Sequence, residues 1–229
     1  LAHLTRAKVG LGLDRPIPIF LLGCFGGLAV ILLPSLIGYW SGGIELVAPP
    51  AGAPVHGLDA LPAVLFLLPG LMVAAFSEEL VLRGFLLRYW QRSLGTVPAV
   101  LATASLFAVM HMWNPSASLL GAIGAFIAGV WLGLAFVGSG NLLLVTGLHL
   151  GWNAGITVVL GLPMSGIPAA PSLAVLAPTS GDTAQMLWGG AYGPEEGVAF
   201  HMALTAAVLA SLVLAPLLRQ APRGSTSSD

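Results

Sequence analysis

The chain has 229 residues, of which 57% are apolar and only 7% are charged. Soluble domains carry about 25% charged residues, so this composition indicates an integral membrane protein. The net charge of −1 offers no basic surface for neutralising phosphates, which excludes nucleic acid as a partner.

Six apolar stretches follow one another along the chain. Each is close to the length of about 20 residues that a helix needs to cross roughly 30 Å of hydrocarbon, and the alternating pattern of a membrane barrel does not occur. We therefore expect an all-α fold, a polytopic transmembrane helical bundle, with one transmembrane domain over 16–218. The expected spans are 16–40, 58–87, 95–112, 117–137, 141–161 and 197–218.

The basic residues predict how these spans are oriented. Lys and Arg near the ends of membrane helices gather on the cytoplasmic side. All eight fall before the first span, at or after the end of the second, or after the last, whereas the connections 41–57, 113–116 and 162–196 contain none. Both termini are therefore expected in the cytoplasm, with 1–15 a basic flank and the Ser-rich 219–229 a disordered tail.

The connection 162–196 is long, rich in Gly and Pro, and more apolar than a plain linker. Loops of this length inside a compact domain are usually functional or disordered. We therefore expect this segment to form a lid or a re-entrant segment over a polar site.

The second span contains three ionisable residues, Glu78, Glu79 and Arg83, within six positions. Intramembrane charges are costly and usually face a partner or a water-filled cavity. Glu79 precedes Arg83 by four residues, the favourable order for an ion pair on one helix face. Glu78 points about 100° away from that face. We predict that Glu79 and Arg83 brace the helix and that Glu78 is left free for chemistry.

Two later spans carry further polar side chains. His111 lies at the end of the third span, and His149 and Asn153 lie four residues apart in the fifth, on one helix face. With a rise of 1.5 Å per residue, Glu78 and these three residues lie at depths of roughly 12 to 22 Å from the cytoplasmic edge. We therefore predict that all four converge on one site near the middle of the bilayer.

The opposite face of the fifth span has a different pattern. Gly147, Gly151 and Gly155 recur every four residues. Small residues at this spacing let helix backbones approach closely in a bilayer. One face of this helix is thus expected to pack while the other carries the site.

A carboxylate with two imidazoles and an amide can hydrolyse an acyl bond. Glu78 is the candidate base that takes a proton from water, a neighbouring imidazole can orient that water, and His149 and Asn153 can donate hydrogen bonds to an oxyanion. Glu78, His111 and His149 could alternatively bind a catalytic Zn²⁺, because two His and one Glu with an open position suit that ion. We expect no cofactor and keep Zn²⁺ as the alternative.

Three motifs on successive apolar spans carry a family resemblance: Glu-Glu-x-x-x-Arg, Phe-x-x-x-His and His-x-x-x-Asn. In this order they resemble the motifs of the CAAX-protease and bacteriocin-processing (CPBP) family of intramembrane peptidases. Here they consist of Glu78, Glu79 and Arg83, then Phe107 and His111, then His149 and Asn153. The resemblance covers about residues 58–161. The run 193–196 also looks like a feature of some bacterial members.

The resemblance implies a multi-pass endopeptidase of a prokaryotic plasma membrane, which hydrolyses a peptide bond in or next to the bilayer. Its substrates would be membrane-associated peptides or proteins, including prenylated ones. It also implies that Glu78 and His111 activate the water, while His149 and Asn153 stabilise the oxyanion. Glu79, Arg83 and Phe107 would have supporting roles.

Two other functions stay open as alternatives. A catalytically idle membrane scaffold or immunity protein of the same fold would keep the bundle without turnover. An ion-coupled carrier would also place Glu and His residues at mid-membrane. Carriers commonly show internal repeats and broken helices, however, and the sequence shows neither.

Overall fold

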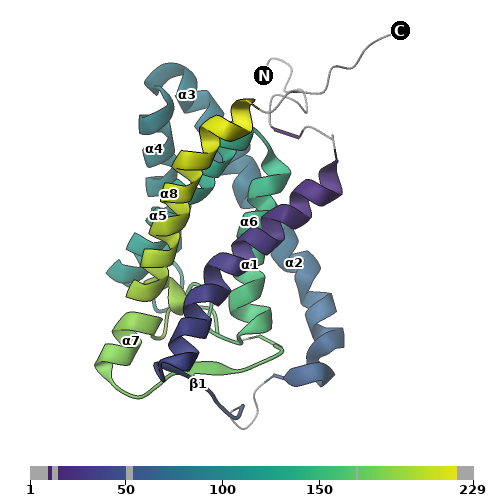
Figure 1. Ribbon diagram of the computed structural model, residues 1–229, viewed down its shortest axis with the longest axis vertical. Coiled ribbons are helices and arrows are strands. Elements are labelled where there is room, and N and C mark those ends of the chain that lie inside the picture. The colour runs from purple at the N-terminus through teal and green to yellow at the C-terminus, as the bar shows by residue number, and fades with distance from the viewer. Residues whose placement is uncertain (1–9, 12–14, 50–53, 169, 221–229) are drawn as a thin grey trace.

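The computed structural model describes residues 10–11, 15–49, 54–168 and 170–220. Within these residues the chain is a bundle of apolar helices with one small two-stranded sheet at one end (Figure 1). The predicted all-α class is therefore confirmed. Most of the predicted basic flank and nearly all of the predicted tail lie outside the described residues.

The helices alternate in direction along the bundle. They are α1 (Pro16–Trp40), α2 (Leu61–Glu79), α3 (Arg88–Leu94), α4 (Thr96–His111), α5 (Leu119–Ser139), α6 (Leu142–Ala154), α7 (Asp182–Trp188) and α8 (Val198–Gln220). Shorter elements are the 3₁₀ turns η2 (Gly57–Ala60) and η5 (Pro194–Glu196), the π-helical segments η3 (Leu80–Leu87) and η4 (Gly155–Val159), and strands β1 (Ile44–Leu46) and β2 (Leu176–Pro178). The segment η3 joins α2 and α3 into one long helix that ends at Leu94, and η4 extends the helix of α6 to Val159.

Every predicted span coincides with a helix. Within the described part of the chain, four helices are long and apolar enough to cross a membrane: 16–40, 57–94, 119–139 and 142–159. The spans predicted at 95–112 and 197–218 correspond to α4 and α8, whose described apolar stretches, Thr96–His111 and Val198–Val213, are shorter. The chain is thus an integral membrane protein.

The connections divide between two ends of the bundle. The start of α1, the turn between α3 and α4, and the end of α8 lie at the upper end in Figure 1, whereas β1, α7 and the start of α2 lie at the lower end. Arg88 and Arg92 belong to α3 at the upper end. This alternation agrees with the predicted topology, in which the upper end faces the cytoplasm.

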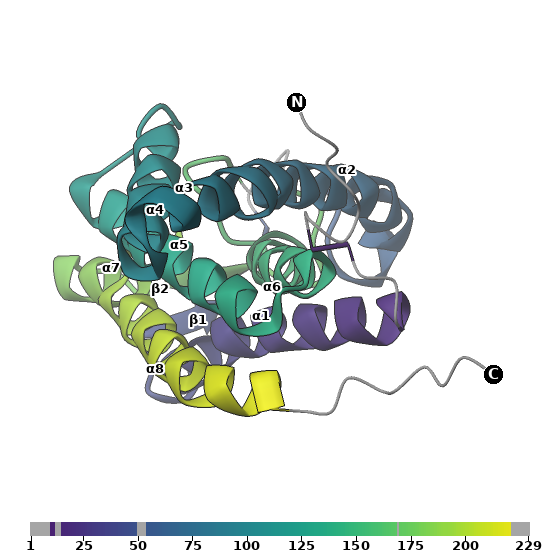
Figure 2. The same cartoon turned by 90° about the horizontal axis from the view of Figure 1, so that it is seen from above.

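The central helix of the bundle is α6. Seen from above, it lies between α1, α2 and α5 (Figure 2). Two thirds of the apolar stretch of this helix, Leu142–Val159, is buried within the protein. In each of the other three helices that are long enough to span a membrane, less than half of the apolar stretch is buried. A helix that is enclosed on several sides can hold side chains rigidly, and α6 carries His149 and Asn153.

The backbones of α1 and α6 almost touch, because glycines line the contact. A Cβ atom added to Gly151 would lie 2.1 Å from the carbonyl oxygen of Cys24, and one added to Gly27 would lie 1.9 Å from that of Leu148. Gly147 and Gly155 also face α1 at close range. The predicted packing face of small residues is therefore present, on the side of α6 that contacts α1.

This contact leads to a prediction for Gly151→Ala. The added methyl group would overlap a backbone carbonyl that cannot rotate away, so the free energy of unfolding should fall by about 1–3 kcal/mol or more. Thermal unfolding in detergent micelles, followed by circular dichroism, measures the change. Gly70→Ala is the matched control, since a Cβ there meets no atom of the described residues within 4 Å. Equal melting temperatures for the two variants would contradict the close packing of α1 and α6.

Candidate active site

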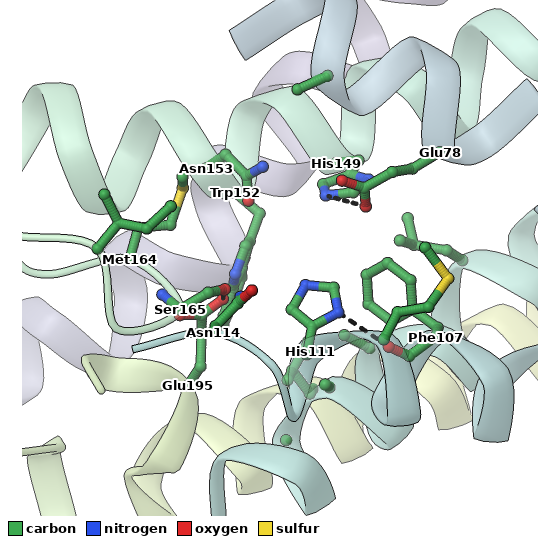
Figure 3. Close-up of a pocket in the computed structure, with 18 of the residues that line it drawn as sticks. Glu78, Phe107, His111, Asn114, His149, Trp152, Asn153, Met164, Ser165 and Glu195 are labelled. Carbon is green, nitrogen blue, oxygen red and sulfur yellow. Dashed lines mark hydrogen bonds and ion pairs between the residues drawn. The ribbon is translucent and has the colours of Figure 1, made fainter. Parts of the chain in front are cut away.

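A cavity of about 290 Å³ lies between α2, α4, α5 and α6 and is lined by the four residues that were predicted to converge. Glu78 comes from α2, His111 from the end of α4, and His149 and Asn153 from α6. Figure 3 shows Glu78 and His149 on one wall and His111 on the facing wall, with the space between them open. Most of the remaining wall is apolar, so a polar group inside meets few competing partners.

Glu79 and Arg83 form the predicted brace, which follows Glu78 directly in the chain and is fully buried. Arg83 Nη1 donates to Glu79 Oε1 over 2.7 Å, and both side chains are fully buried. The second terminal nitrogen of Arg83 donates to the carbonyl oxygen of Gly129 on α5 over 3.1 Å. The ion pair therefore fixes η3 against α5 as well as pairing two charges.

Glu79 also holds His149, a contact that the sequence did not reveal. His149 Nδ1 lies 2.9 Å from Glu79 Oε1. Because a carboxylate only accepts hydrogen bonds, Nδ1 carries the hydrogen, so Nε2 is an acceptor while the ring is neutral and a donor when the ring is protonated. Nε2 lies 3.9 Å from Glu78 Oε2. Glu79 thus orients the imidazole so that its other nitrogen approaches Glu78.

His111 is oriented in a comparable way by its own helix. Its Nδ1 donates to the carbonyl oxygen of Phe107 over 2.8 Å, which leaves Nε2 for the cavity. The Phe107 ring lies 4.3 Å from the His111 ring and 5.9 Å from the His149 ring, measured between centroids. The guanidinium carbon of Arg83 lies 5.1 Å from the centre of the same ring. The Phe107 ring therefore contacts both imidazole rings and helps to set the distance between them.

Glu78 is the accessible carboxylate of the pair. Its side chain is 33% exposed, against 0% for Glu79. Among the described residues, Glu78 Oε2 and Glu79 Oε2 are both buried without a hydrogen-bond partner. The exposed part of the Glu78 side chain can meet a water molecule or a substrate, whereas Glu79 is enclosed and bonded to Arg83 and His149.

Three polar residues from loops also line the cavity without having been predicted: Asn114, Ser165 and Glu195. The latter two belong to 162–196, which was expected to lie over a polar site. This segment is held across the end of the bundle by pairing of β2 with β1. Two adjacent Glu residues at the end of an apolar loop were the sequence signal for Glu195, but no role was assigned to them.

The alternative Zn²⁺ site would consist of Glu78, His111 and His149. Within the described ranges, no group of three or more His, Cys, Asp or Glu side chains is arranged to hold a metal ion. The Nδ1 contacts of His149 with Glu79 and of His111 with the Phe107 carbonyl leave the Nε2 atom of each ring available, so these contacts do not decide between the two interpretations. The need for a metal is a matter for experiment.

Comparison with protein families matches residues 60–155 to the type II CAAX prenyl endopeptidase Rce1-like family. The matched segment, which is less than half of the chain, is similar to this family. The match runs from the start of α2 to the end of α6 and includes every residue of the three motifs. The predicted resemblance to the CPBP family is confirmed, and the Rce1-like family is a family of proteases. No curated protein and no solved structure matches the chain.

The buried brace of the Rce1-like site leads to a prediction for Arg83→Met. Removing one partner leaves the Glu79 carboxylate buried and uncompensated, which should lower the free energy of unfolding by about 3–5 kcal/mol. Replacing both residues, as in Glu79→Gln with Arg83→Met, should restore most of that loss. Denaturant unfolding in micelles measures both variants. A double variant no more stable than the single one would show that the buried charge is not the cause.

Proposed function

We propose that this chain is an intramembrane endopeptidase, which hydrolyses a peptide bond in or next to the membrane with water activated by Glu78. One observation carries the proposal: the cavity presents the partly exposed carboxylate of Glu78 to two imidazoles that other contacts hold in place. Similarity to a protease family supports it.

In this mechanism Glu78 is the general base. Its partly exposed carboxylate takes the proton of the attacking water, and the lone pair of His111 Nε2 accepts a hydrogen bond from the same water and orients it. The bond to the Phe107 carbonyl keeps His111 in the tautomer that this role requires. A base and an orienting group on facing walls hold the water between them.

The oxyanion is stabilised from α6 in the proposed mechanism. The side-chain amide of Asn153 can donate a hydrogen bond to it. His149 gives its Nδ1 hydrogen to Glu79, so it can donate through Nε2 only as an imidazolium. Glu79 at 2.9 Å and Glu78 at 3.9 Å lie beside that ring to balance the charge. His149 therefore supplies a positive charge as well as a hydrogen bond.

The substrate class follows from the setting of the cavity. Apolar walls within a membrane bundle suit a peptide that is held at the bilayer, and the family is described as prenyl endopeptidases. We propose a membrane-associated protein with a lipidated C-terminus as the type of substrate, and a prokaryotic plasma membrane, crossed several times by the chain, as the site of action.

The decisive variant is Glu78→Gln. The amide keeps the shape of the side chain but cannot take a proton, so kcat on a prenylated peptide should fall by about 10²-fold to 10⁴-fold. The assay is cleavage of that peptide by purified protein in micelles, read by mass spectrometry. Ser77→Ala is the matched control, because Ser77 is exposed and its hydroxyl binds carbonyls of its own helix. Equal rates for wild type and Glu78→Gln would refute the glutamate mechanism.

Chelation tests the expected independence of metal ions. Because no group of three or more His, Cys, Asp or Glu side chains among the described residues is arranged to hold a metal ion, peptide cleavage should continue at an unchanged rate after dialysis against a strong zinc chelator. Elemental analysis of the purified protein accompanies the assay. Loss of activity that a single added metal restores would overturn this expectation.

A further inference from the structure

A second carboxyl group, that of Glu195, lines the same cavity as Glu78. It belongs to η5, just before α8, and lies outside the three motifs and outside the matched residues 60–155. Figure 3 shows Glu195 beside Ser165 and Asn114, on the opposite side of the cavity from Glu78. A peptide bond in the cavity would therefore have one carboxyl group on each side.

The position of Glu195 is fixed by contacts with three parts of the fold. Ser165 binds both of its carboxyl oxygens, one through the backbone N–H and the other through the hydroxyl over 2.7 Å. His201 Nε2 donates to the carbonyl oxygen of Glu195 over 2.9 Å. On α5, Gly124 leaves no room for a Cβ, which would lie 1.9 Å from that carbonyl. The carboxyl group is thus held in a defined place.

Glu196, the adjacent residue, has a different role. Its carboxylate accepts hydrogen bonds from Ser118 Oγ and from the backbone N–H groups of Gly190 and Tyr192, over 2.7 to 3.1 Å. These contacts join the loop to the start of α5, so Glu196 organises the fold. Glu195 instead faces the cavity, as Glu78 does beside Glu79.

The surroundings of Glu195 let it carry a proton near neutral pH. Burial raises the pKa of its carboxyl group to about 7, although the Ser165 hydrogen bonds, His149 and Trp152 act in the other direction. The remaining ionisable groups around it are Tyr192 and Glu196 in its own loop, His201 on α8, and Glu78 and His111 across the cavity. A carboxyl group that is protonated at neutral pH can serve as a general acid.

We propose that Glu195 is a catalytic acid that gives its proton to the leaving amine. The inference rests on the proposed peptide hydrolysis. The water oxygen bonds to the carbonyl carbon while Glu78 takes one of its protons. Glu195 then protonates the amide nitrogen as the C–N bond breaks, which yields a carboxylic acid and an amine. The new carboxylic acid returns a proton to Glu195, and Glu78 passes its proton to the amine.

The test compares two substrates cut by wild type and by Glu195→Gln. One is a prenylated peptide, and the other is the same peptide with a thioester in place of the scissile amide. A thiolate leaves without being protonated, whereas an amide nitrogen does not. Glu195→Gln should therefore lower kcat on the amide by about 10²-fold and on the thioester by less than about 3-fold.

The pH profile gives a second readout. Because the acid works in its protonated form, wild-type kcat/KM on the amide should fall as the pH rises through about 7, and Glu195→Gln should lack this limb. Glu195→Asp, which keeps a titratable group, should retain it. Should Glu195→Gln fail to fold, Glu195→Asp and the wild-type profile carry the test, and a wild-type profile that is flat through this range overturns the proposal.

Glu196→Gln is the matched control, and it should leave the ratio of amide to thioester rates unchanged even where it lowers the melting temperature. Equal losses on both substrates in Glu195→Gln, or no loss on either, would overturn the acid role and leave the Glu78 mechanism standing. Loss of both activities in Glu78→Gln supports that mechanism independently. Cleavage of neither substrate by wild type would overturn the proposed function and this inference together.

Discussion

The buried contacts of Glu79 are the interaction on which the site depends. One oxygen of this carboxylate accepts hydrogen bonds from both Arg83 and His149, and Arg83 reaches on to the Gly129 carbonyl. Charges taken out of water cost several kcal/mol each unless they are paired and hydrogen-bonded. The bundle therefore has to close around all of these groups at once, and their contacts align η3, α5 and α6 with one another. Glu78 and His149 face the cavity because Glu79 is held in this way.

Two pairs of adjacent glutamates, 78–79 and 195–196, lie on opposite sides of the cavity (Figure 3), and in each pair the two members have different roles. Glu79 and Glu196 accept hydrogen bonds from other parts of the fold, whereas Glu78 and Glu195 line the cavity. Neighbouring residues point in directions about 100° apart on an α-helix and about 120° apart on a 3₁₀ turn. A pair of identical side chains can therefore anchor one element with one member and present the other member to a ligand.

Much of the fold could be predicted because the length of an apolar stretch is a local property. The first predicted span, 16–40, has the same bounds as α1, and the i,i+4 spacing of Glu79 and Arg83 was enough to predict their ion pair. The prediction that His111 and His149 share one site needed only an estimate of depth. These features depend on residues close in sequence or on a single coordinate across the bilayer.

Other features depend on tertiary packing and could not be predicted in this way. Glu79 and His149 are 70 residues apart, and their contact exists only because α6 lies against α2. The positions of Ser165 and Glu195 depend on the path of the loop 162–196. This loop can pack against α5 because Gly124 has no side chain that would collide with the Glu195 carbonyl. The pairing of β1 with β2 joins two loops whose sequences have no strong strand pattern. Such contacts are set by the assembled bundle.

The two π-helical segments have a consequence for any attempt to move this site into another protein. The helix of Glu78 becomes π-helical at Leu80, and that of Asn153 at Gly155, in each case within two residues of the site. Because i→i+5 hydrogen bonds widen the turn, residues beyond these points are rotated relative to an unbroken α-helix. If the same sequence motifs were placed on ideal α-helices, the side chains of Arg83 and of the residues after Gly155 would point in other directions. A transplant would have to copy the backbone irregularities together with the motifs.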